Sequence, residues 1–221
     1  MTDDWEDPDF DDQWDKLLEG ATVPRDFHSE YLSAPFLRCI DCETELLDAQ
    51  QAYSVIKSYV ARETVFEMAI CGRCSMRLAE SYSAESKAAF ENSMRQWKQR
   101  QPPAPPTIAA DPDAATADSS LPSDWLLPGD VNQLQHCASC GRSREACHRY
   151  SIVGTFLGRA LVSAPQAPLQ LPLLICDECN SAATENISRQ TRDSWDRFVE
   201  DHFDGPPGIE LDSPKFDPVL L

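Results

Sequence analysis

Alternation of apolar and polar side chains predicts two extended segments in the first half of the chain. The stretches YSVIKSYV at 53–60 and ETVFEMAI at 63–70 are rich in the β-branched and aromatic residues that are typical of strands. Alternation places Tyr53, Val55 and Tyr59 on one side of the first segment. We expect the two segments to form a hairpin.

A helical periodicity follows, with apolar residues three and four positions apart. Ser83 and Ser188 each precede such a pattern, and a serine hydroxyl is a good acceptor for the free amides of a first helical turn. The two predicted stripes face a core and consist of Phe90, Met94 and Trp97 in the first pattern, and Trp195, Phe198 and Val199 with Phe203 nearby in the second.

The two halves of the chain repeat one another. RYSIVGTFL from Arg149 corresponds to AYSVIKSYV from Ala52, so that Tyr53 matches Tyr150. Ser83 and Ser188 each lie nine residues after a cysteine that closes a Cys-x-x-Cys pair. Fixed offsets of this kind indicate an internal duplication. The predicted fold class is α+β, with two tandem treble-clef-like units that each contain a knuckle, a hairpin, a second knuckle and a helix.

Four Cys-x-x-Cys pairs form the chemical core of the repeat. The pairs are separated by 28 residues in the first unit and by 35 in the second, where SAPQAPLQLP at 163–172 lengthens the loop. Both gaps exceed the roughly 15–20 residues of the commonest zinc pattern, but the duplicated set of four supports the same interpretation. The candidate metal ligands are Cys39, Cys42, Cys71 and Cys74 in the first unit and Cys137, Cys140, Cys176 and Cys179 in the second.

Four thiolates favour a structural zinc ion, because zinc takes soft ligands tetrahedrally and a closed shell leaves no position for a catalytic water. A unit of this size secures only about 3–5 kcal/mol from its core. A structural zinc ion contributes about 10–16 kcal/mol of apparent binding free energy to folding. We therefore expect two structural zinc ions per chain and no other cofactor. Redox-active thiols and an iron–sulfur site are the alternatives, and Cys147 remains as an unassigned thiol.

The net charge of −18 is concentrated outside the two units. Residues 1–30 contain 11 acidic and 2 basic residues, whereas residues 31–100 contain 9 of each. We predict an acidic, aromatic and disordered tail over 1–30, zinc modules over 31–100 and 131–204, a linker rich in Pro, Ala and Asp over 101–130, and a C-terminal tail over 205–221. An acidic chain repels phosphate backbones, so nucleic acid is an unlikely partner and a basic protein is favoured.

Nine cysteines, the lack of an apolar leader and the lack of an apolar run of about 20 residues predict a reducing, cytoplasmic location without a membrane span. In the N-terminal tail, Trp14, Leu17 and Leu18 fall on one side of a possible short helix. This spacing leaves open both a solvated tail and a peptide that docks into a partner.

The motifs CASCGRS at 137–143 and ICDEC at 175–179 resemble the N-terminal zinc-binding domain of the ClpX unfoldase family. The resemblance covers about a tenth of the chain and implies a treble-clef module in which Cys137, Cys140, Cys176 and Cys179 bind zinc and which recruits proteins and pairs with a similar module. The chain has a longer middle, is duplicated and contains no G-x-x-x-x-G-K-[ST] loop, so the resemblance does not extend to ATP-driven unfolding.

The sequence predicts a non-enzymatic zinc adaptor or scaffold for protein–protein interaction, since it contains no nucleophile constellation, acid–base pair or phosphate loop. Two alternatives remain open. One is an acidic inhibitor or decoy of the immunity or nucleic-acid-mimic type, which would act through its tails. The other is a thiol redox protein that uses the Cys-x-x-Cys pairs. The sequence does not predict the partner or the oligomeric state.

Overall fold

The computed structural model describes residues 20–100, 127–163, 170–185 and 187–203. The first half contains η1 (Arg25–Phe27), β1 (His28–Ser29), β2 (Ala34–Pro35), β3 (Ala52–Val60), β4 (Glu63–Cys71), α2 (Gly72–Glu80) and α3 (Ala84–Arg100). The second half contains β5 (Leu127–Pro128), η3 (Val131–Gln135), η4 (Arg144–Ala146), β6 (Arg149–Leu157), β7 (Ala160–Ser163), β8 (Leu173–Cys176), α4 (Asp177–Thr184) and α5 (Arg189–His202). The predicted α+β class is confirmed.

The strands of both halves form one six-stranded sheet, with β3 and β6 antiparallel at its centre. These strands pair over nine residues, from Ala52 opposite Leu157 to Val60 opposite Arg149. Ile56 lies opposite Val153, and these two positions are equivalent in the repeat. The two units are therefore related by a pseudo-two-fold axis that passes through this pair, so that main-chain hydrogen bonds join them.

The insertion in the second unit divides one strand into two. In the first unit β3 pairs with the single strand β4, whose Cys71 lies opposite Tyr53. In the second unit β6 pairs with β8 near Cys176 and with β7 at its other end. Residues 164–169 of the insertion lie outside the described residues. Strand β7, which precedes them, also pairs with β5. The second unit thus keeps the hairpin of the first while accommodating a longer loop.

The hydrophobic core lies on both faces of the sheet. Tyr53 stacks on Phe156, with ring centroids 5.1 Å apart, and Phe27 meets the same Phe156 edge-on at 5.2 Å. A Cβ atom at Gly154 would lie 2.6 Å from the Phe27 ring, so glycine at this position makes room for that side chain. Helices lie against the opposite face, where Trp195 of α5 approaches Phe66 of β4.

The segment 20–30 belongs to the folded part, although we predicted it as part of the acidic tail. Phe27 is fully buried, and Arg144 binds the carboxylate of Asp26 at 2.7 Å. The sequence does not reveal that Phe27 is buried, because its neighbours are charged and one aromatic residue alone forms no periodic pattern. Residues 1–19, with the predicted apolar stripe of Trp14, Leu17 and Leu18, lie outside the described residues.

A buried lysine holds the N-terminal hairpin on the sheet. Lys57 is 2% exposed, and its Nζ donates a hydrogen bond to the His28 carbonyl at 2.6 Å. Glu67, directly opposite on β4, lies 3.4 Å from this Nζ and also accepts from the Ser29 hydroxyl at 2.7 Å. The charge is thereby paired as well as hydrogen-bonded, which is the condition for burying it.

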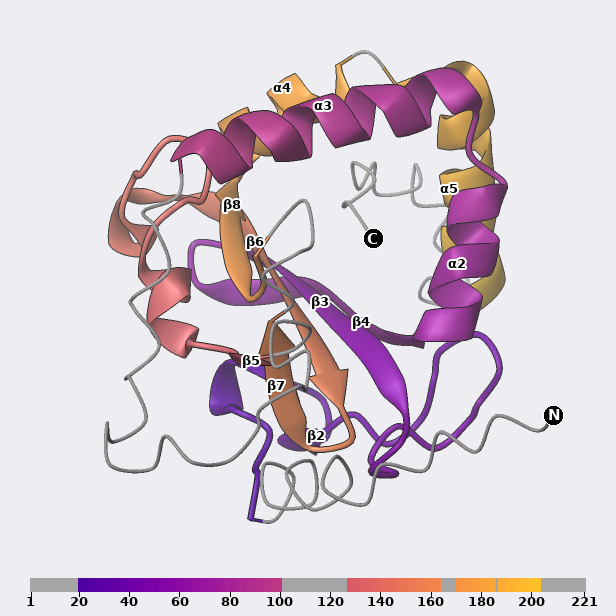
Figure 1. The fold of residues 1–221 in the computed structure, drawn as a ribbon, viewed down its shortest axis with the longest axis vertical. Coiled ribbons are helices and arrows are strands. Elements are labelled where there is room, and N and C mark those ends of the chain that lie inside the picture. Colours follow the sequence, from indigo (N-terminus) through magenta and orange to yellow (C-terminus); the bar gives the residue numbers. More distant parts are fainter. Residues whose placement is uncertain (1–19, 101–126, 164–169, 186, 204–221) are drawn as a thin grey trace, which may run out of the picture.

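Each long helix packs against the other unit. In Figure 1, α3 passes beside α4. Helix α5 reaches the end of α2, where the Gln190 side chain donates to the Ser81 carbonyl at 3.2 Å. The ring of Phe203, which follows α5, lies 4.8 Å from that of Phe66 in β4. The predicted stripe residues Phe90, Trp97, Trp195, Phe198 and Val199 are buried, so the apolar faces of both helices contribute to the shared core.

The starts of the two long helices are joined by reciprocal hydrogen bonds. The Ser83 and Ser188 hydroxyls are 2.8 Å apart, and Ser188 accepts from the Thr191 amide as predicted for a cap. The amide of Ser83 donates to the Thr191 hydroxyl at 3.1 Å, and the amide of Ser188 donates to the Ser86 hydroxyl at 2.9 Å. In an ordinary capping box these bonds stay within one helix. Here each helix caps the other.

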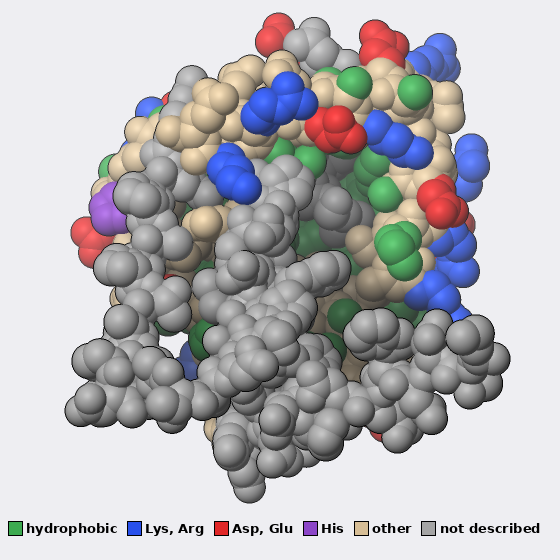
Figure 2. All heavy atoms as spheres, viewed as in Figure 1, with side chains coloured by type: hydrophobic (Ala, Val, Ile, Leu, Met, Phe, Trp, Pro, Cys, Tyr) green, Lys and Arg blue, Asp and Glu red, His purple; other side chains and the backbone are tan. Residues whose placement is uncertain are grey.

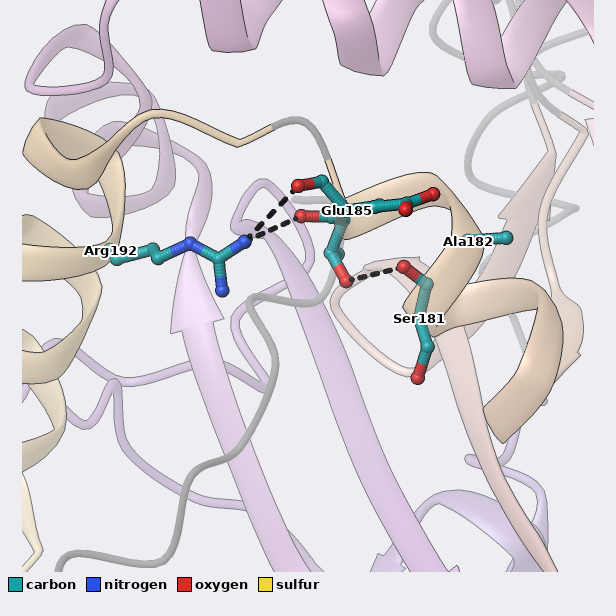
Figure 3. A pocket seen from close by; sticks show the side chains of 5 residues that line it. Ser181, Ala182, Glu185 and Arg192 are labelled. Atoms are coloured by element: carbon teal, nitrogen blue, oxygen red, sulfur yellow. Dashed lines mark hydrogen bonds between the residues drawn. The ribbon is translucent and has the colours of Figure 1, made fainter.

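Basic side chains complete the ends of the short helices in both units. Arg192 reaches back from α5 to the carbonyls of Thr184 and Glu185 at the end of α4, at 3.0 and 3.5 Å (Figure 3). Lys87 occupies the equivalent place in α3 and donates to the Glu80 carbonyl of α2 at 3.2 Å. Cations at this position satisfy free carbonyls and complement the helix dipole.

Candidate metal centres

The first metal centre lies between a knuckle and the start of α2. Cys39 and Cys42 come from a turn closed by the bond from the Cys39 amide to the Thr44 carbonyl, at 2.9 Å. Glu43 follows with a φ of 59°, in the left-handed region. Cys71 is the last residue of β4 and the N-cap of α2, and Cys74 lies in the first turn of that helix. A hairpin therefore carries one pair of thiols to the other.

The second centre has the same local construction. The Cys137 amide donates to the Arg142 carbonyl at 2.8 Å, and Gly141 takes the left-handed position with a φ of 73°. Cys176 caps α4 as Cys71 caps α2. The amides of these two capping residues donate to the sulfurs of Cys39 and Cys137 at 3.3 and 3.4 Å. Amide bonds to ligand sulfur are outer-shell contacts of the kind that orient metal ligands.

The structure brings the eight candidate ligands together in two groups of four. Within each group the sulfur atoms all lie within 4.8 Å of one another. This spacing fits a tetrahedral thiolate shell with Zn–S distances of about 2.3 Å. The two groups are structural zinc sites, so the expected cofactor of two zinc ions per chain is supported by their geometry.

The thiols differ in their acidity before a metal binds. A backbone hydrogen bond at Thr44 lowers the pKa of Cys42 to about 6, and neighbouring sulfurs act in the same direction. Burial raises the pKa of Cys74 and Cys176 strongly. Zinc requires the thiolate form, so binding at these deeper positions releases protons and favours neutral or alkaline pH.

A polar cluster next to the first site was not predicted from the sequence. Arg77 of α2 donates to the Asp41 carboxylate and lies 3.7 Å from the Cys74 sulfur. His202 at the end of α5 lies 3.6 Å from the same carboxylate. Burial acts to raise the pKa of Asp41, but the bond from Arg77 and the other neighbouring groups outweigh it and lower the pKa. The only sequence signal was an arginine one helical turn beyond a ligand.

Cys147 is not part of either group. It is buried, and its sulfur donates to the Ser143 carbonyl at 3.3 Å. Burial raises the pKa of this thiol, and the nearby Cys137 acts in the same direction. The ninth cysteine thus lies close to the second centre as a protonated thiol.

Comparisons with protein-family models, with curated proteins and with solved structures found no match. The resemblance to the ClpX zinc-binding domain therefore stays a prediction from two motifs. Among the described residues, no helix is both long and apolar enough to cross a bilayer. The fold and the two sites make the chain an α+β protein with two four-cysteine zinc sites.

Proposed function

We propose that the protein is a non-enzymatic zinc adaptor that presents its surface to protein partners, with each half built as a treble-clef-like module. Four thiolates fill the coordination shell of each ion, so neither centre offers a position for a substrate or an activated water. The zinc ions then serve to hold the knuckles and helices in place. The function belongs to the surfaces that the modules display.

The observation that carries the proposal is a run of exposed apolar side chains immediately before the first knuckle. Tyr31 is 92% exposed, Leu32 50% and Leu37 55%, all within one seven-residue stretch. These three side chains are close in the sequence, and exposed apolar side chains that form a contiguous patch commonly mark an interaction site. The residue that precedes this stretch is anchored to the sheet, because the Glu30 amide donates to the Glu67 carboxylate of β4 at 2.8 Å.

Charge supports a protein partner in preference to nucleic acid. Lys and Arg side chains on the face shown in Figure 2 are spread over the helices and interspersed with acidic ones. A phosphate backbone requires a continuous basic surface. Nine of the 11 acidic residues of 1–30 precede residue 20, and they favour a basic partner whose attraction is strongest at low salt.

The test is affinity purification of the full chain followed by mass spectrometry, compared with the variant Tyr31→Ser/Leu32→Ser. We expect specific partners to be lost from the variant while its zinc content stays unchanged. Asn92→Ser, on an exposed position of α3, is the matched control and keeps the partners. Identical partners in the wild type and the Tyr31→Ser/Leu32→Ser variant would contradict the proposed surface.

The acidic inhibitor is the second candidate, because the negative charge is concentrated in the flanks. It differs from the adaptor in depending on the tails alone. Removal of residues 2–19 abolishes the binding of an inhibitor, whereas an adaptor that uses 31–37 retains at least part of it. Zinc analysis distinguishes a thiol redox enzyme from an adaptor, since the working dithiols of a redox enzyme would be free of zinc.

A further inference from the structure

The two zinc centres share a ligand set but differ in how exposed their cysteine residues are. Cys42 of the first centre is half-buried, whereas the equivalent Cys140 of the second is exposed. Cys74 is fully buried, whereas its counterpart Cys179 is half-buried. Solvent and small reagents therefore reach the second centre more readily.

Helix α2 also carries two arginines next to the ligands of the first centre. Arg77 contacts the Cys74 sulfur at 3.7 Å, and Arg73 is an exposed residue of the same helix, directly before Cys74. Four thiolates leave a zinc site with net negative charge. Hydrogen bonds and cations next to the sulfurs withdraw electron density from them and lower their reactivity.

The second centre lacks both arginines at the equivalent helix positions. Glu178 stands where the first unit has Arg73, and Ala182 stands where it has Arg77. Arg142 lies near the second centre and is bound by the Glu178 carboxylate at 2.6 Å, as Arg77 is bound by Asp41 at the first, so the two helix positions are what distinguish the centres. Ser139 adds an uncharged hydrogen bond to Cys179. The second centre therefore has a carboxylate and a methyl group where the first has two guanidinium groups.

We propose that the second zinc centre is an oxidant-sensitive modification site at which a hydroperoxide attacks Cys140 and releases the ion, while the first centre stays intact. The greater exposure of Cys140 and the absence of the two helix arginines both favour reaction at the second centre. The distance between neighbouring sulfurs does not, because Cys140 and Cys176 are 3.8 Å apart and Cys42 and Cys71 are 3.7 Å apart.

The chemistry takes two steps. The Cys140 thiolate attacks one oxygen of the peroxide, the O–O bond breaks, and a sulfenic acid and hydroxide form. The Cys176 thiolate then attacks this sulfur, an S–S bond forms, and a second hydroxide leaves. Two thiolates have lost two electrons to the peroxide, and zinc has lost two of its four ligands. A dithiol reductant and added zinc reverse the change.

The experiment treats the full chain, loaded with two zinc ions, with a few equivalents of hydrogen peroxide in the presence of a chromogenic zinc chelator. We expect one zinc ion per chain to leave about tenfold or more faster than the other, the size of effect that outer-shell groups have on metal sites. Peptide mass spectrometry locates the first disulfide at Cys140, and dithiothreitol with zinc restores the starting protein. Release of both ions at one rate, or a first oxidation at the first centre, would overturn the proposal.

Two exchanged variants test the cause. Arg73→Glu/Arg77→Ala gives the first centre the neighbours of the second, and we expect its ion to be released faster. Glu178→Arg/Ala182→Arg gives the second centre the neighbours of the first, and we expect its release to slow. All four positions are exposed on helices, so the changes spare the core. Release rates that do not respond to either exchange contradict the role of the arginines.

Cys147→Ser provides the remaining control, because it removes the ninth thiol from the neighbourhood of the second centre. Ordered release is expected to persist in this variant. Loss of the order in Cys147→Ser would assign the reaction to the spare thiol and overturn the attack at Cys140. The readout is zinc release, so it stands or fails independently of partner binding through residues 31–37.

Discussion

At the scale of single residues, Lys57 shows how this chain holds a charge inside its sheet. The side chain is 3% exposed and lies between the His28 carbonyl and the carboxylates of Glu67 and Glu30. Removal of one partner from a buried pair leaves an uncompensated charge, which costs far more than the pair contributes. The N-terminal segment depends on this contact, since Ser29 and Glu30 both bind Glu67.

We predict that Lys57→Met lowers the free energy of unfolding by about 3–5 kcal/mol, because the Glu67 carboxylate, whose side chain is only 17% exposed, then loses its cation. The measurement is urea unfolding at saturating zinc, followed by the fluorescence of the tryptophans. Arg189→Met is the control: its pair with Asp193 is largely exposed, with side chains 93% and 56% accessible, and costs less than about 1 kcal/mol. Equal losses in the two variants would contradict the structural role of Lys57.

At the scale of elements, the reciprocal caps of α3 and α5 connect the two halves. Serine before each helix was predicted as a cap from the sequence, and Ser188 fills that role with a bond from the Thr191 amide. The bonds between the helices were not predicted, because Ser83 and Thr191 are 108 positions apart and a cap motif contains only local information.

We predict that Ser83→Ala and Thr191→Val each destabilise the protein by about 1 kcal/mol, the usual cost of a lost cap. The double variant is expected to lose less than the sum, since both changes remove hydroxyls from one network: the Ser188 hydroxyl lies 2.8 Å from that of Ser83 and donates to that of Thr191 at 3.3 Å. A double-mutant cycle on thermal unfolding checks this, with Asn92→Ala as the exposed control in α3. Strict additivity would place the two caps in independent helices.

At the scale of the whole molecule, the sequence allowed the repeat, the ligands and the starts of the long helices to be predicted, but not how the units associate. Hairpin residues such as Tyr53 and Val55 have a local alternation that predicts a strand. The pairing of β3 with β6 depends on main-chain bonds between segments about a hundred residues apart, which leave no periodic trace. Phe27 was missed for a related reason, since its neighbours are charged and its burial is decided by distant Phe156 and Gly154.

The shared sheet leads to a prediction about the connector. A protease site placed within 101–126 and then cleaved is expected to leave residues up to 100 and from 127 associated, because nine residue pairs between β3 and β6 and the reciprocal caps join them. Size-exclusion chromatography of the cleaved protein measures this association: the two fragments elute together under native conditions and separately under denaturing conditions. Two separately eluting, folded fragments under native conditions would show that the halves are independent modules.

In each half of the molecule, one zinc ion bound by four thiolates substitutes for hydrophobic core. X-ray absorption at the zinc edge, combined with elemental analysis of the purified chain, tests it most directly. We expect two zinc ions per chain, each with a shell of sulfur alone at about 2.3 Å. One zinc ion or none per chain, or oxygen and nitrogen in the shell of a fully reduced sample, would contradict it.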